Sequence, residues 1–426
     1  MSDTKLLAVQ WAGETVGYLA PQRKGRVKFS YAPEWIEKNN QPISLSLPCS
    51  EVSFDAQKST AFFGNLLPEE NMHKELCREA RIDVADTYTF LHRFGQECAG
   101  ALVIVPEGEE PGNHPPAYRD ITDELESIIN SHKGVPIGNL IAKTGVRLSI
   151  AGAQNKLPVT VENGRFFVPA DGSYAPTTAI LKPTSYFFPD LHRNELFCME
   201  LARSVGLNTP EASLLQIGEH QAYVIMRYDR QRTESGIVRL HQEDFCQALG
   251  VGHDLKYEEY GGPGFAACGK VLLHPLVSEY GAARESFIKC ALFNYVIGNC
   301  DAHAKNFSLL YYGTKGLRLA PFYDLVSTMA YPELAQKFAM AIGKTFRFDR
   351  IAEHSWKEFA AAMNIRAERV FSLAEEVCAS VAPAVEPLAA RHEKQYGAAP
   401  IYETLAQVVR KGLEQLARMA ESNKAK

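Results

Sequence analysis

The N-terminal region alternates hydrophobic and polar residues with the short period of β-strands. Two such runs, Leu6–Trp11 and Thr15–Leu19, flank a short turn around Gly13, and this pattern predicts a β-hairpin. Pro42–Pro48 also alternates, which predicts a half-buried strand. Phe62–Arg81 instead has the spacing of an amphipathic helix. This part of the chain therefore predicts mixed, β-rich structure.

A loop rich in Pro, Gly and Glu, Pro106–Pro116, interrupts the pattern. It follows the apolar run Cys98–Val105, which predicts a buried strand. Such a loop is a natural boundary between domains. Residues 1–110 are therefore predicted to form a small module of their own.

Beyond this loop, short strands and one amphipathic helix precede a long, mainly helical remainder. That helix is Asn194–Val205, with Phe197 and Leu201 on one face and Gly206 after its last turn. The other predicted elements are a helix at Asp123–His132 and strands at Leu157–Val161, Arg165–Val168, Ala179–Lys182, Glu211–Ile217 and Ala222–Arg227. The order predicts a two-lobed α+β fold: the module 1–110, a β-rich N-terminal lobe at 111–225 and a helical C-terminal lobe at 226–426.

The composition narrows the class of protein. The chain has 426 residues and a formal net charge of −5, which argues against a dedicated nucleic-acid binder. A local cationic patch is compatible with this charge, and Lys344, Arg347 and Arg350 form the best cluster. The 9 cysteines are scattered singly, as in proteins of a reducing compartment. Because we find neither a signal-peptide pattern nor a run of ~20 apolar residues, we expect a cytoplasmic protein that contacts no membrane.

The segment Asn299–Phe307 carries the first candidate chemistry, directly after an apolar run, Phe287–Gly298, that predicts a helix. It contains Asp301 and Asn306, and Asp-x4-Asn is the spacing of the protein-kinase catalytic loop. In that loop the aspartate accepts the proton of the substrate hydroxyl, and the asparagine holds Mg²⁺. Asp and Asn are also common in ordinary turns, so the pair alone leaves both interpretations open.

A second carboxylate, Asp324, ends the strand-like run Leu317–Asp324. A hairpin would return it to the same site, and Mg²⁺ on a nucleotide takes one or two protein oxygen ligands. Asn306 and Asp324 are therefore candidate metal ligands. Alternatively, Asp324 caps a helix at Leu325–Met329.

Three upstream features match the nucleotide side of a kinase. Arg147–Lys156 is a loop of small residues, which lets backbone N–H groups approach phosphate. Lys182 ends an apolar strand, where it either contacts phosphates or is a surface lysine. Glu195 opens the next helix and either orients Lys182 as an ion pair or favours the helix N-terminus through the macrodipole. Each feature is ambiguous alone, but their order along the chain is that of the parts of a kinase.

These segments are similar to the HipA family of bacterial serine/threonine kinases. The matching segments are Ser149–Lys156, Leu181–Pro183, Asn194-Glu195, Leu201-Ala202, Gly206–Asn208, Tyr228–Arg230, Gln242–Asp244, Gly261–Gly264, Asp301–Ser308 and Pro321–Asp324. Three N-terminal runs resemble that family's N-terminal module: Tyr31–Trp35, Ser44–Pro48 and Asn65–Pro68. The resemblance covers nearly the whole chain and weakens after Tyr331.

The resemblance implies an ATP- and Mg²⁺-dependent kinase that phosphorylates a serine of a translation protein, typically an aminoacyl-tRNA synthetase, and so halts growth. It also implies a HipB-like helix-turn-helix antitoxin as partner, with operator DNA reached mainly through that antitoxin. Asp301 would accept the proton, Asn306 and Asp324 would hold Mg²⁺, and autophosphorylation of Ser149 would switch the kinase off. The implied ATP contacts are Ala151, Gly152, Ala153, Gln154, Asn155, Lys156, Lys182, Met226, Arg227, Tyr228, His303, Ala304, Lys305, Asn306, Tyr323 and Asp324. Of these, Met226–Tyr228 would hold adenine through the backbone.

Two alternatives from other classes stay open. A catalytically inactive co-repressor would only bind the antitoxin and DNA, but such proteins tend to lose catalytic acids, and Asp301, Asn306, Asp324 and Lys182 are all present. A small-molecule phosphotransferase uses the same acids and is not excluded by the sequence. The chain is not a eukaryotic-type kinase, because no His-Arg precedes Asp301 and no Asp-Phe-Gly occurs at Asp324.

Overall fold

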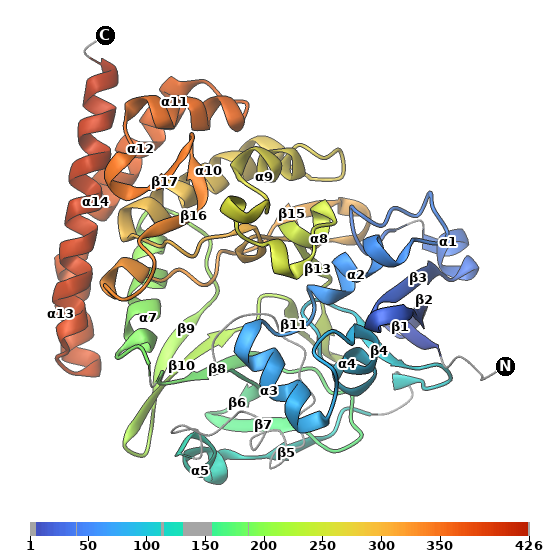
Figure 1. Cartoon of the computed structure of the whole chain (residues 1–426). Helices are drawn as coiled ribbons and strands as arrows, with labels where there is room; N and C mark the ends of the chain where they lie inside the picture. Colours follow the sequence, from blue (N-terminus) through green and yellow to red (C-terminus); the bar gives the residue numbers. More distant parts are fainter. Residues whose placement is uncertain (1–5, 40, 112–114, 131–155, 186, 425–426) are drawn as a thin grey trace. The chain divides into compact units, whose positions relative to one another are not determined.

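The structure is a computed structural model that describes residues 6–39, 41–111, 115–130, 156–185 and 187–424 (Figure 1). The predicted loop residues Ser149, Ala151, Gly152, Ala153, Gln154 and Asn155 lie outside this part of the chain. The fold is α+β, as predicted, and the chain divides into two compact units. Unit 1 comprises Met1–Tyr186, Leu215–Asp254 and Leu309–Thr314, and unit 2 comprises Phe187–Leu214, Leu255–Ser308 and Lys315–Lys426. The predicted three-part division at residues 110 and 225 stays a prediction.

Unit 1 is built on two sheets. The first is antiparallel with the order β3-β2-β1-β4, and the second has the order β5-β7-β6-β8-β10-β9. Their strands are β1 (Leu7–Trp11), β2 (Glu14–Pro21), β3 (Val27–Tyr31), β4 (Val103–Pro106), β5 (Tyr118–Asp120), β6 (Leu157–Glu162), β7 (Arg165–Pro169), β8 (Ala179–Pro183), β9 (Ala212–Ile217) and β10 (His220–Met226). Seven predicted strands of this region are confirmed to within a few residues: Leu6–Trp11, Thr15–Leu19, Leu157–Val161, Arg165–Val168, Ala179–Lys182, Glu211–Ile217 and Ala222–Arg227.

Short elements complete unit 1. Its helices are α1 (Pro33–Asn39), α2 (Ala56–Gly64), α3 (Glu70–Ala80), α4 (Thr87–Phe94), α5 (Leu125–Asn130) and α8 (Phe245–Leu249). Its remaining strands are β11 (Arg230–Thr233), β12 (Gly236–Arg239), β13 (Gln242–Asp244) and β14 (Ser308–Tyr311). The predicted hairpin is confirmed: Ala12 and Gly13 both have positive φ, as a type I′ turn requires. Phe29 of β3 packs on Phe63 of α2, with ring centroids 5.3 Å apart, and these rings centre the core.

The predicted strand at Pro42–Pro48 is wrong. Ser44 and Leu47 form only an isolated bridge, because this segment turns toward Glu243 rather than along a sheet. The N–H of Leu45 lies 3.1 Å from the Glu243 carboxylate, and the Ser44 hydroxyl lies 2.6 Å from it. A distant acid therefore determines the local backbone here.

Two further predictions were wrong in their bounds. Phe62–Arg81 is not one helix, because α2 ends at Gly64 and α3 begins only at Glu70. Pro68 lies in the gap, where proline disfavours a continuous helix. The strand predicted at Cys98–Val105 starts at Val103, since Gly100 adopts a φ of 79° that breaks the extended run.

Unit 2 is mainly helical, as predicted (Figure 1). Its helices are α7 (Leu191–Ser204), α9 (Phe265–Leu272), α10 (Tyr280–Ile297), α11 (Glu353–Ala362), α12 (Ala367–Val381), α13 (Val385–Tyr396) and α14 (Pro400–Lys424), and its strands are β15 (Leu317–Leu319), β16 (Lys337–Ile342) and β17 (Thr345–Arg347). Phe287–Ile297 of α10 is buried except for Lys289, so this helix is the centre of the unit. The long helix α14 crosses it closely at Gly412, where an added Cβ would lie 2.3 Å from the Val296 carbonyl oxygen. Within the described residues, no helix has both the length and the apolar character that a membrane span requires.

Candidate active site

The segment that carries Asp301 begins where the central helix α10 stops. Gly298 ends the helix in the left-handed conformation, and its N–H donates to the Asn294 and Tyr295 carbonyl oxygens. A larger residue does not fit there, because an added Cβ would lie 2.8 Å from the Met329 side chain. The predicted position of Asp301, on a loop at the end of a rigid helix, is therefore confirmed.

The Asp301 carboxylate is held from one side. Its Oδ1 accepts a hydrogen bond of 2.7 Å from the Tyr257 hydroxyl and lies 4.0 Å from Nε2 of His303. No described residue hydrogen-bonds to Oδ2, and 49% of the side chain is exposed. A carboxylate with one oxygen fixed and the other accessible can accept a proton from a substrate hydroxyl.

Asn299 ties this loop to the segment of Asp324. Its Oδ1 accepts the Asp301 N–H at 3.1 Å, and its Nδ2 donates to the Asp324 carbonyl oxygen at 3.2 Å. The side chain is almost completely buried, so both bonds are shielded from water. Asn299 is not among the predicted site residues, because nothing in its local pattern separates it from a turn residue.

The side chain of Tyr323 links the segment of Asn306 to that of Asp324. The Tyr323 hydroxyl donates to the Lys305 carbonyl oxygen at 2.8 Å, so the residues that directly precede Asn306 and Asp324 are hydrogen-bonded. Asn306 uses its Nδ2 to donate to the Asp301 carbonyl oxygen at 3.3 Å, which leaves its amide oxygen for other partners. An amide oxygen and a carboxylate are the hard donors that Mg²⁺ takes, so the donor set fits this ion.

The alternative role of Asp324, capping a helix, is wrong. No α-helix follows it in the structure: Ser327 is the N-cap of a single 3-10 turn, η8 (Thr328–Ala330). Instead Asp324 adopts a φ of 52°, and the backbone beyond it is fixed by a buried side chain of α7. Asn194 accepts the Ser327 N–H and donates to the Ser327 carbonyl oxygen, both at 2.9 Å. Asn194, which is part of the family-like pair Asn194-Glu195, thus has a structural role that the sequence did not indicate.

The other predicted residues of this loop, His303, Ala304 and Lys305, are buried. His303 packs edge-on against the ring of Tyr257, with centroids 5.5 Å apart. Ala304–Asn306 forms the 3-10 turn η6. Unit 2 therefore contains four of the predicted site residues: Asp301, Asn306, Tyr323 and Asp324.

Unit 1 carries the lysines predicted to contact phosphate. Lys182 exposes only 9% of its surface, and its Nζ lies 5.6 Å from the ring centroid of Tyr223. The surface-lysine interpretation is therefore wrong. Lys156, which directly precedes β6, is also buried. Glu195 is buried in unit 2, and its ion pair with Lys182 stays a prediction.

Arg227 belongs to a buried ion network that the sequence did not reveal. Its guanidinium contacts Glu97 at 2.6 Å and Asp229 at 2.8 Å. Its backbone N–H donates to the Thr178 carbonyl oxygen at 2.9 Å. Both donor groups of Arg227 are thus engaged within unit 1. Beside it, Met226 pairs with Ala179 of β8, and the Tyr228 hydroxyl donates to Gln242. The predicted adenine contact at Met226–Tyr228 remains a prediction.

Family models match most of the chain. A HipA N-terminal domain matches residues 7–105, and a HipA-like C-terminal domain matches residues 148–385. The chain belongs to the HipA family. It is 37% identical over 392 residues to the putative kinase Y4mE of Sinorhizobium fredii. The matched stretch covers 90% of this chain and 92% of that protein. It is 30% identical over 336 residues to the serine/threonine-protein kinase toxin HipA of Shewanella oneidensis, covering 74% of this chain and 73% of that one.

A solved structure agrees with this assignment. HipA of Shewanella oneidensis, in a complex with HipB and its operator DNA, superposes with a TM-score of 0.79 at 25% identity, covering 98% of this chain and 97% of that one. The HipA-family chain is thus a serine/threonine-protein kinase, and the roles predicted for Asp301, Asn306 and Asp324 in that activity stay predictions.

Proposed function

We propose that this HipA-family kinase transfers the γ-phosphoryl group of ATP to a serine of a protein, with Asp301 as the proton acceptor. The hydroxyl oxygen of the serine forms a bond to the γ-phosphorus, the bond to the β-phosphate oxygen breaks, and ADP leaves. The hydroxyl proton passes to Asp301. The observation that carries this proposal is the Asp301 carboxylate itself, fixed at Oδ1 and half-exposed at the end of α10.

Asn306 and Asp324 would hold Mg²⁺ through their side-chain oxygens. When bound, the ion neutralises charge that develops on the phosphates. Within the chain, the hydrogen bond of Tyr323 to Lys305 and the bond of Asn299 to the Asp324 carbonyl oxygen keep these two ligands in register. Lys156 and Lys182, both buried, are the proposed phosphate contacts of unit 1.

The target and the regulation follow from the family. We propose a translation protein as substrate, an aminoacyl-tRNA synthetase in particular, whose phosphorylation halts growth. Autophosphorylation of Ser149 would switch the kinase off, since a phosphate adds about −1.5 to −2 charges at pH 7 and repels ATP from the loop. The similarity to a kinase named as a toxin supports the arrest of growth.

The proposed partner is a HipB-like antitoxin, because a structure that matches 98% of this chain is that of a HipA bound to HipB and operator DNA. Operator DNA would be reached mainly through the antitoxin. The cationic cluster of unit 2 supports this indirect route: Arg347 lies 2.8 Å from Asp349, and Lys344 lies 3.0 Å from Glu358. Two of the three cations are thus already paired with acids.

One experiment tests the proposed function. The purified kinase is incubated with γ-labelled ATP and a lysate of its own host, and labelled species are identified by mass spectrometry, with Asp301→Asn as the control. We expect a labelled serine on a synthetase that is absent with the control. Label that appears only in small molecules would instead support the phosphotransferase alternative. Absence of any label that depends on Asp301 would favour an inactive co-repressor.

A further inference from the structure

The segment Gly261–Gly264 is one of those that resemble the HipA family, and none of the kinase roles described above involves it. Its backbone closes on the residue that touches Asp301. The N–H groups of Tyr260 and Gly262 both donate to the Tyr257 carbonyl oxygen, at 3.1 and 2.9 Å. An added Cβ on Gly262 would lie 2.2 Å from the Leu255 carbonyl oxygen and 2.7 Å from that of Tyr257. Only glycine permits this close return of the chain.

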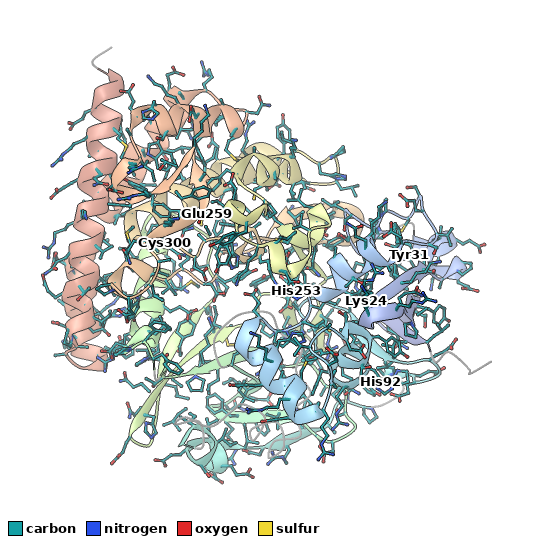
Figure 2. The ribbon with its side chains drawn as sticks, in the orientation of Figure 1. Lys24, Tyr31, His92, His253, Glu259 and Cys300 are labelled. Atoms are coloured by element: carbon teal, nitrogen blue, oxygen red, sulfur yellow. The ribbon has the colours of Figure 1, made fainter. Side chains whose placement is uncertain are left out.

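The turn is anchored to the sheet of unit 2. Between Tyr257 and the glycines lies the 3-10 turn η5 (Glu258–Tyr260). The Glu258 carboxylate accepts the Ala341 N–H of β16 at 2.6 Å, and Glu259 lies 2.8 Å from Nζ of Lys337 on the same strand. Figure 2 labels Glu259 from this turn and Cys300 from the catalytic loop. The chain that directly follows Tyr257 is therefore attached to β16.

The ring of Tyr257 is held as firmly as its backbone. His303 packs edge-on against it at 5.5 Å, and Nζ of Lys256 lies 5.1 Å from its centroid. From this position the hydroxyl donates to Oδ1 of Asp301 at 2.7 Å. Ring packing and a short hydrogen bond to an anion together define one orientation of the carboxylate.

We propose that Tyr257 is a positioning residue for phosphoryl transfer, and that the Gly261–Gly264 turn serves to hold it. Tyr257 occupies Oδ1, so that Oδ2 of Asp301 faces the substrate hydroxyl. Without that bond the half-exposed carboxylate rotates freely, and fewer encounters have the geometry for proton transfer. This inference deepens the proposed function and rests on the role of Asp301 as proton acceptor. It places the effect in kcat, because neither ATP nor the protein substrate need touch Tyr257.

The direct test is Tyr257→Phe, which removes the hydroxyl and keeps the ring against His303. We expect kcat for transfer to the protein substrate to fall about ten- to a hundredfold, as for loss of a hydrogen bond to a charged group, with KM for ATP unchanged. Tyr260→Phe is the matched control. Its ring lies 6.4 Å from that of Tyr257, its side chain is exposed, and kcat should stay at the wild-type value.

A second variant tests the turn. Gly262→Ala places a Cβ against two backbone carbonyls, so it should displace Tyr257 and lower kcat as Tyr257→Phe does. Gly281→Ala is its control, because a Cβ there meets nothing within 4 Å. An unchanged kcat for Gly262→Ala, with the fold retained by circular dichroism, would overturn the role of the turn.

The outcomes separate this inference from the proposed function. If Asp301→Asn is inactive while Tyr257→Phe keeps full kcat, or only raises KM, the positioning role is overturned and the kinase assignment stands. If Asp301→Asn is as active as wild type, the proposed function itself fails, and the inference fails with it. A lowered kcat for Tyr257→Phe beside an unaffected Tyr260→Phe supports both.

Discussion

Glu97 lies at the centre of the buried ion network of unit 1. Replacing it by Gln measures how much its negative charge contributes to the free energy of unfolding. Its carboxylate accepts hydrogen bonds from Arg227 at 2.6 Å, Arg230 at 3.1 Å and Arg239 at 2.6 Å. Gln keeps the size of the side chain but removes the carboxylate that pairs with all three guanidinium groups, and the other carboxylate of the network, that of Asp229, pairs with Arg227 and Arg230. The network joins a residue of the N-terminal module to the segment after β10, so its loss should loosen that connection.

The magnitude follows from the electrostatics. Burial raises the pKa of Glu97, but the attraction of Arg239, Arg230 and Arg227 outweighs it and lowers the pKa from 4.5 to about 2. Since one pKa unit corresponds to about 1.4 kcal/mol, the charge stabilises unit 1 by about 3 kcal/mol at neutral pH. Breaking a buried ion pair costs ~3–5 kcal/mol, which is consistent. Because the folded-state pKa is depressed, this stability is present above about pH 4.5 and is lost as the pH falls toward 2.

Urea titrations measure this loss. Tryptophan fluorescence is a suitable probe, because Trp11 and Trp35, two of the 3 tryptophans, lie in unit 1. We expect Glu97→Gln to lower the free energy of unfolding by about 3 kcal/mol at pH 7 and by much less near pH 3. Glu51→Gln is the control, since its exposed ion pair with Lys58 should contribute at most ~1 kcal/mol. An equal loss for both variants, or a loss independent of pH, would refute the reasoning.

Two further predictions concern other acids. Burial raises the pKa of Glu243 from 4.5 to about 7, so the stability contributed by its protonated form is full below about pH 4.5 and is lost as the pH rises through 7. Urea titrations at pH 5.5 and 8 should therefore show a drop that Glu243→Gln abolishes, and an unchanged pH dependence in the variant would contradict this. Asp324→Ala should lose Mg²⁺-dependent ATP binding in titration calorimetry, because Asn306 alone offers no anionic ligand; unchanged affinity would remove Asp324 from the metal site.

Local patterns predicted much of the fold and the catalytic loop. The hairpin at Gly13, the strands around Lys182 and the helix before Asp301 each depend on the periodicity of a short segment, and each is confirmed. The strand predicted at Pro42–Pro48 failed because its backbone is determined by Glu243, far away in the sequence.

Apart from the bond between Asn299 and the Asp301 N–H, two positions apart, the site contacts that the sequence did not reveal join distant parts of the chain. Tyr257 meets Asp301 across 44 positions, and Asn194 meets Ser327 across 133. No spacing rule covers such separations, because the fold alone brings the partners together. The side chain of Arg227 is bound to Glu97 and Asp229 within the fold, which no local pattern indicated, and the predicted adenine contact at Met226–Tyr228, which runs through the backbone, stays a prediction.

The central claim is that Asp301 accepts the proton in phosphoryl transfer. Its most direct test compares Asp301→Asn with the wild type in two assays, single-turnover transfer of the γ-phosphoryl group to a protein serine and equilibrium binding of MgATP. The account predicts a rate lower by ~10²–10⁴-fold with nearly unchanged ATP affinity, because a general base acts in the transition state and contributes little to nucleotide binding. A variant that keeps the wild-type rate, or one that loses activity only because it no longer binds ATP, would contradict it.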